Sequence, residues 1–167
     1  MKYNMLCVFA ALLLIVGCKN KSETGSDADT GIIAESSYLS DVVGVEDNGV
    51  LKVKNPDKIK KYWNDKLKAE NIAGNLKDIE IIRAKPIDTT ASYYVLVAKS
   101  EDKKTKVSAF LVIKDNEFYF ERPEALSLVI CQGCIDGCNP IVSVHNGTKS
   151  IVCSPCLECV KGNLEIY

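Results

Sequence analysis

The sequence predicts an α+β protein: one helix packed on an antiparallel β meander, followed by a small cysteine-rich β-hairpin module. Three observations support this prediction. Apolar residues recur at helical spacing after Asn55, strand-like runs separated by turns follow from residue 79, and six of the eight cysteines lie in the last 37 residues. A helical pattern followed by a series of short strands is typical of α+β folds.

Residues 1–17 have the layout of a secretory signal peptide. Lys2 supplies a positive charge, an apolar run extends from Met5 to Val16, and the small residue Gly17 follows. The run is about a dozen residues long, whereas a helix needs roughly 20 apolar residues to cross a membrane. We therefore expect a cleaved signal peptide in place of a transmembrane anchor.

The residues Ile15-Val16-Gly17-Cys18 resemble the lipobox of bacterial lipoproteins at every position. The resemblance implies cleavage before Cys18, a diacylglyceryl thioether on its sulfur and usually an acyl group such as palmitate on the new amino terminus. Several acyl chains hold a protein firmly on a membrane, whereas a single chain is marginal. In enteric lipoproteins an Asp at the next position holds the protein at the inner membrane. Lys19 occupies that position, so the resemblance implies the outer membrane. Whether the domain faces the periplasm or the cell exterior stays open.

Residues 18–37 are predicted to be the lipidated cysteine and a disordered tether. Residues 19–31 contain Ala28 as their only apolar residue, and such a stretch cannot bury enough surface to offset the entropy of ordering. The α+β domain is assigned to residues 38–126 and the cysteine-rich module to residues 127–167. Maturation removes one of the 21 basic residues and none of the 22 acidic ones, and this balance argues against a nucleic-acid partner.

A helix is predicted to begin at Asn55-Pro56-Asp57. Asn55 can cap it, Pro56 suits the first helical position, and Asp57 interacts favourably with the helix dipole. Gly74 is a plausible end. The apolar stripe consists of Ile59, Tyr62, Trp63 and Leu67.

Five runs of residues read as strands: 79–84, 93–99, 107–114, 118–122 and 127–131. A two-residue turn at Asp115-Asn116 sets the register between the third run and the fourth. We expect the helix to cover one face of this sheet. The residues expected on that face are Leu96, Ala98, Leu111, Ile113, Phe118 and Phe120.

The opposite face of the predicted sheet is also apolar, and a water-exposed face would alternate more strictly to polar residues. It consists of Tyr93, Val95, Val97, Phe110, Val112 and Tyr119. Either residues 32–53 or the cysteine-rich module covers it, or it binds a partner protein or an apolar ligand. A helix followed by a curled meander resembles cystatin-like and related α+β folds in pattern only, and a fold does not imply a function.

The cysteine-rich module contains two cysteine triplets separated by a predicted hairpin. Residues 141–145 and 148–152 read as strands, and Asn146-Gly147 is a strong type I′ turn signal. In this register Pro140 opposes Cys153, so the hairpin brings the triplets together at its base. The triplets are Cys131, Cys134 and Cys138, then Cys153, Cys156 and Cys159.

Two chemistries fit these six thiols, and three disulfides are favoured because export leads to an oxidising compartment. Antiparallel strands most simply predict a nested pairing: Cys131–Cys159, Cys134–Cys156 and Cys138–Cys153. A zinc site is the alternative, since two Cys-x-x-Cys pairs have suitable spacing. Thiol-redox catalysis is disfavoured. A reactive Cys-x-x-Cys pair usually lies at a helix N-terminus, which lowers the thiol pKa, whereas the Gly and Pro residues around these pairs indicate loops.

The sequence contains no recognisable catalytic set, and its single histidine, His145, lies beside a predicted turn. We therefore predict a non-enzymatic binding or structural lipoprotein of the cell envelope, with no catalytic residue, no metal and no cofactor. The alternative is an envelope thiol-redox or zinc-binding protein that uses the Cys-x-x-Cys pairs.

Overall fold

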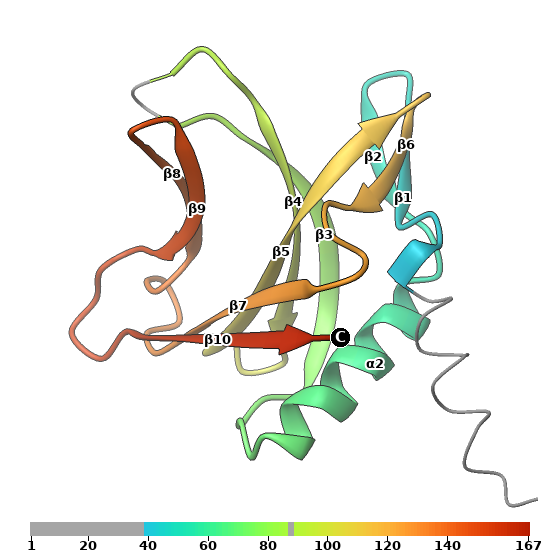
Figure 1. Cartoon of the computed structure of the whole chain (residues 1–167). Coiled ribbons are helices and arrows are strands. Elements are labelled where there is room, and N and C mark those ends of the chain that lie inside the picture. Colours follow the sequence, from blue (N-terminus) through green and yellow to red (C-terminus); the bar gives the residue numbers. More distant parts are fainter. Residues whose placement is uncertain (1–38, 87–88) are drawn as a thin grey trace, which may run out of the picture.

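The computed structural model describes residues 39–86 and 89–167, which form a curled antiparallel sheet with helix α2 (Pro56–Ala69) against it and a separate hairpin on the other side (Figure 1). The predicted signal peptide, Cys18 and the whole predicted tether lie outside the described residues. The strands are β1 (Gly44–Asp47), β2 (Val50–Val53), β3 (Leu76–Ala84), β4 (Tyr93–Ser100), β5 (Thr105–Lys114), β6 (Glu117–Phe120), β7 (Leu126–Gln132), β8 (Pro140–His145), β9 (Thr148–Cys153) and β10 (Val160–Ile166).

Strand β5 is the centre of an eight-stranded sheet. One of its edges pairs with β4, and the other pairs with β6 and β7, which follow one another along it. Strands β1 and β2 continue the sheet beyond β6, and β10 continues it beyond β7. Because β3 pairs with β4 and also lies near β2, the sheet is nearly closed. The predicted domain division at residues 126–127 therefore cuts through one continuous sheet.

The predicted register of the central hairpin is confirmed. Asp115 and Asn116 have positive φ angles of 51° and 65°, as a type I′ turn requires. Leu111 pairs with Phe120, and Ile113 pairs with Phe118. Leu111, Phe118 and Phe120 are buried in one cluster with Trp63 of α2, whereas Ile113 lies outside this cluster and is 37% exposed.

Helix α2 has the predicted start but ends before Gly74. Asn55 occupies the N-cap position in a left-handed conformation and makes no side-chain capping bond, so its predicted capping role is wrong. The helix ends at Ala69 because Asn71 adopts a left-handed conformation with φ 56°. The amide of Ile72 then donates to the carbonyl of Leu67 (2.8 Å), which completes a Schellman motif.

The main core lies between α2 and the sheet, as predicted. Trp63 and Leu67 are fully buried there, and the Trp63 ring centroid lies 6.3 Å from that of Phe120. The buried members are Leu39, Val43, Ile59, Trp63, Leu67, Leu76, Ile81, Leu96, Ala98, Val107, Ala109, Leu111, Phe118, Phe120, Leu126, Leu128, Ile130 and Ile166.

The fold class is correct only in part, because the structure is largely β and not a balanced α+β arrangement. Strands β1, β2 and β10 were not predicted. Asn48-Gly49, with φ angles of 51° and 80°, joins β1 to β2 and carries the same turn signal as Asn146-Gly147. Residues 160–166 alternate apolar or small side chains with polar ones, which is a strand signal.

Candidate functional site

The predicted hairpin in the cysteine-rich module is confirmed. Strands β8 and β9 pair with Pro140 opposite Cys153 and Val142 opposite Ile151. The turn has Asn146 at φ 50° and Gly147 at φ 77°. We call this hairpin, residues 140–153, the arm; Figure 1 shows it standing beside the main sheet.

The arm covers much of the sheet face opposite α2. Ile151 is 3% exposed and belongs to a second buried cluster with Val95, Val97 and Val129. The cysteine-rich module, one of the two predicted intramolecular covers, therefore packs on this face. Tyr93, Val112 and Tyr119 are only partly buried and lie outside the second cluster.

One lysine fastens the side of the arm to this face. The Lys149 ammonium group lies 4.7 Å from the ring centroid of Phe110 and 5.3 Å from that of Tyr93. It also forms a 2.5 Å ion pair with Glu121. Two aromatic faces and a carboxylate are a favourable environment for a cation. The arm is therefore held by Lys149 as well as by apolar packing.

All six cysteines of the module form disulfides, and two of the three predicted pairs are wrong. Cys134–Cys156 agrees with the nested prediction, whereas the other two bonds join Cys131 to Cys153 and Cys138 to Cys159. The three bonds span nearly constant sequence separations of 22, 22 and 21 residues. The two triplets are thus matched in the same order along the chain.

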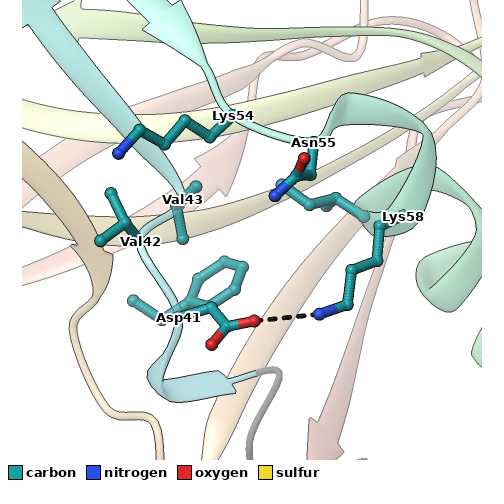
Figure 2. A pocket seen from close by; sticks show the side chains of 8 residues that line it. Asp41, Val42, Val43, Lys54, Asn55 and Lys58 are labelled. Atoms are coloured by element: carbon teal, nitrogen blue, oxygen red, sulfur yellow. Dashed lines mark hydrogen bonds and ion pairs between the residues drawn. The ribbon is translucent and has the colours of Figure 1, made fainter.

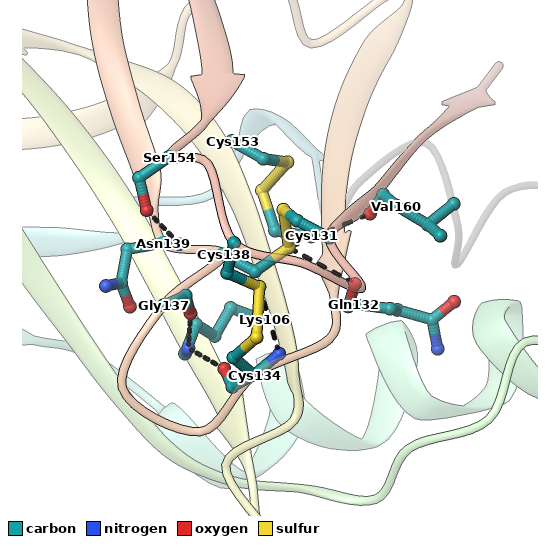
Figure 3. Close-up of a disulfide and its surroundings, with 12 residues drawn as sticks. Lys106, Cys131, Gln132, Cys134, Gly137, Cys138, Asn139, Cys153, Ser154 and Val160 are labelled. Atoms are coloured by element: carbon teal, nitrogen blue, oxygen red, sulfur yellow. Dashed lines mark hydrogen bonds between the residues drawn. A yellow bond between two sulfur atoms is a disulfide. The ribbon is translucent and has the colours of Figure 1, made fainter.

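The nested prediction fails because the antiparallel register ends at the base of the arm. The last pair is Pro140 with Cys153, and Cys138 has a φ of 52°, so the first triplet does not continue a strand. Cys131 instead lies within β7, inside the main sheet. Because the arm folds back over β7, its last residue, Cys153, lies against Cys131 (Figure 3).

The two loops that carry the cysteines pack closely against each other. A Cβ on Gly133 would lie 2.6 Å from the carbonyl oxygen of Glu158, and one on Gly137 would lie 2.8 Å from Cys156 Cβ. Reciprocal hydrogen bonds join Asn139 to Ser154. The backbone N–H of Asn139 donates to the Ser154 hydroxyl, and the backbone N–H of Ser154 donates to the backbone carbonyl of Asn139, both at 2.8 Å.

Lys106 of β5 holds the first cysteine loop, residues 133–139, on the main sheet. Its side chain is almost fully buried, and its ammonium group donates to the backbone carbonyls of Gly137 (2.7 Å), Ile135 (3.1 Å) and Cys134 (3.4 Å) (Figure 3). Burial is the main cause that lowers its pKa, and the nearby Lys99 lowers it further. A buried cation that donates to three carbonyls holds the loop on the sheet. No sequence signal singled this lysine out.

The structure also groups sulfur atoms differently from the predicted zinc site. The Sγ atoms of Cys138, Cys153 and Cys159 lie within 4.8 Å of one another. The spacing argument had instead grouped Cys131 and Cys134 with Cys153 and Cys156. In the oxidised state described here every one of these sulfurs is bonded to another sulfur, so none is available as a thiolate ligand.

Hollows on the surface do not define a ligand class. The cavity beside Asp41 and Lys58, whose ion pair measures 2.9 Å, has a volume of about 10 Å³ (Figure 2) and would hold at most one water molecule. A shallow hollow of about 660 Å³ lies between β4 and the first cysteine loop. Its acidic and basic groups interleave, as in the 2.5 Å ion pair of Glu80 with Lys99.

Comparisons with known proteins return no relatives: no family model, no curated protein and no solved structure matches the chain. Within residues 39–86 and 89–167, no helix combines the length and apolar character needed to span a bilayer. The fold and the disulfide module therefore have to be interpreted from their own chemistry.

Proposed function

We propose that this chain is an exported bacterial lipoprotein, anchored through a lipidated Cys18 and acting as a non-enzymatic binding or structural protein of the cell envelope, most favourably at the outer membrane. The single observation that carries the proposal is the fate of the cysteines. Removal of residues 1–17 and lipidation of Cys18 would leave six thiols, and all six form disulfides in the structure. Such bonds persist in oxidising compartments and are rare in the cytosol.

In this proposal the module stabilises the sheet from the side opposite the helix. The packing of Ile151 against Val95 and Val97, together with the Lys149 contacts, supports that role. A partner protein or an apolar ligand would bind the part of this face that the arm leaves partly open, at Tyr93, Val112 and Tyr119.

Metabolic labelling with a radioactive fatty acid tests the anchor. The label should enter the full chain in bacteria and should be absent from a Cys18→Ser variant, whose other cysteines are unchanged. Cys7 provides a matched control, because Cys7→Ser alters the signal peptide without touching the lipobox and should keep the label. Label that persists in Cys18→Ser would refute the lipid anchor.

The alternative function, a thiol-redox or zinc-binding envelope protein, is supported by one observation. Three sulfurs from two different disulfides lie within 4.8 Å of one another. Reduction of these bonds would therefore produce free thiols that are already close together. Intact mass spectrometry of the native protein separates the two functions. Our proposal requires a species six hydrogens lighter than the reduced chain and free of zinc, whereas free thiols with retained zinc would favour the alternative.

A further inference from the structure

Strand β10 provides a free edge of the main sheet. It pairs with β7 along its whole length and stands at the end of the strand order. Among the residues that the structure describes, no strand pairs with its other edge. Figure 1 shows β10 beside β7, with the C-terminus of the chain at its end. The unpaired backbone groups of an edge strand can hydrogen-bond to a further strand.

A second copy of the same chain is the partner that this edge fits best. Two copies of β10 related by a twofold axis perpendicular to the sheet run antiparallel, and each side chain stays on its own face. In such a pair one residue must oppose itself. Only a register centred on Asn163 pairs all seven residues, from Val160 to Ile166.

The charges of β10 match in this register. Lys161 lies opposite Glu165 of the second copy, and the symmetry creates this pair twice. Both residues are exposed on the same face of the strand, and the Glu165 carboxylate accepts a bond from the Tyr167 hydroxyl. Opposite charges directly across an antiparallel ladder attract, whereas like charges in that position repel.

The apolar and small residues match as well. Val160 is 62% exposed and would lie opposite Ile166 of the second copy, whose side chain belongs to the main core. Gly162 would lie opposite Leu164, so a small residue faces a large one. Pairing therefore places an exposed valine beside an isoleucine and a glycine beside a leucine, so each opposed pair on this face is apolar or small.

We propose that the chain forms a homodimer through antiparallel pairing of β10 with β10 about Asn163, which joins the two sheets into one. This inference goes beyond the proposed lipoprotein function and does not depend on it. A seven-residue ladder buries less surface than a typical stable interface, so the dimer is a weak one that depends on local concentration.

Cysteine cross-linking tests the register. In the dimer the two Asn163 Cα atoms would lie about 4.5–5.5 Å apart, within the reach of a disulfide. The full chain carrying Asn163→Cys, in detergent micelles under mild oxidation, should form a covalent dimer. Lys68→Cys, on the exposed side of α2, is the matched control. Equal cross-linking of the two variants, or none by Asn163→Cys, would overturn the proposal.

Charge reversal tests the pairing independently of the added cysteine. Lys161→Glu and Glu165→Lys should each weaken self-association about tenfold, because two attractive pairs become repulsive. Mixing the two variants should restore association, since every opposed pair then has opposite charges. Analytical ultracentrifugation measures all three samples, and circular dichroism checks that each variant is folded. Folded variants that associate as the parent does, or a mixture that does not recover, would overturn the proposed interface.

Discussion

The two faces of the sheet are stabilised by different chemistry. On the helix face, large apolar side chains such as Trp63, Phe118 and Phe120 are fully buried. On the arm face, the second cluster has six buried residues, and Cys131 and Cys138 are two of them. Burial of apolar area stabilises the first face, whereas covalent bonds restrain the second. From this comparison we expect packing of the arm to depend on the oxidation state of the protein, and packing of α2 to be independent of it.

The largest effect is expected from emptying the helix face. Trp63→Ala should lower the free energy of unfolding by about 3–5 kcal/mol, because it removes the largest buried side chain and leaves a cavity. Urea denaturation followed by circular dichroism measures this loss, which should be the same in kcal/mol whether or not one disulfide of the arm face has been removed.

Trp63→Phe is the matched control for that variant. It keeps an aromatic ring and removes the indole N–H, which is buried and has no hydrogen-bond partner among the described residues. Loss of this unsatisfied donor offsets part of the lost volume. Trp63→Phe should therefore cost much less than Trp63→Ala, and equal losses would contradict the cavity explanation.

A smaller and more local effect is expected from opening one disulfide on the arm face. The double variant Cys138→Ser/Cys159→Ser should lose about 3 kcal/mol, the value for a closed loop of this length. Hydrogen exchange should accelerate mainly in residues 140–153 and 133–139, while the amides of β4 and β5 stay protected.

Cys134→Ser/Cys156→Ser is the natural comparison, because it removes a bond of nearly equal sequence separation, 22 residues against 21, that lies nearer to solvent. Its exchange pattern should change less than that of the first double variant, since Cys138 is fully buried in the second cluster. Rapid exchange of β5 in either variant would show that the two faces are not independent.

A lesser effect is expected from Lys106, which links the sheet to the first cysteine loop. Lys106→Met keeps the buried stem and removes donors to three carbonyls, which should lower stability by about 1–3 kcal/mol. Thermal unfolding measures the loss, and Lys104→Met, at an exposed neighbouring position, is the control. A stability gain in Lys106→Met would mean that desolvation of the ammonium group outweighs its hydrogen bonds.

The smallest effect concerns pH and Glu117 at the start of β6. The Tyr119 hydroxyl (2.7 Å) and the Lys54 ammonium (3.1 Å) donate to Glu117 and lower the pKa of its carboxyl below the usual 4.5. A lowered acid pKa stabilises the fold fully above the unfolded-state pKa, and this contribution disappears as the pH falls through the folded-state pKa.

Melting temperatures measured from about pH 6 down to about pH 3 test this contribution. The parent should exceed Glu117→Gln by a margin that is constant at the upper end and narrows below the ordinary glutamate pKa. Glu124→Gln, which removes a carboxylate from an exposed loop position, is the matched control. A margin that widens on acidification would contradict the sign of the Glu117 shift.

The sequence predicted the hairpins well and their wider arrangement poorly. The registers at Asp115-Asn116 and Asn146-Gly147 were correct, because a two-residue turn sets the pairing of adjacent strands through backbone conformation alone. The same reasoning applied to Asn48-Gly49 would have found β1 and β2. The disulfide pairing failed because it extended the arm's register into loops where Gly133 and Cys138 have positive φ angles.

Local sequence alone therefore determined the turn of the arm, the start of α2 and the convergence of the two cysteine triplets. Backbone preferences and side-chain periodicity act over a few residues, and these features need nothing more. Tertiary packing determined which cysteines meet, where Lys106 binds and how the arm covers the second face. Those outcomes depend on how β7 and β10, far apart along the chain, pair within one sheet, and no short-range preference encodes that pairing.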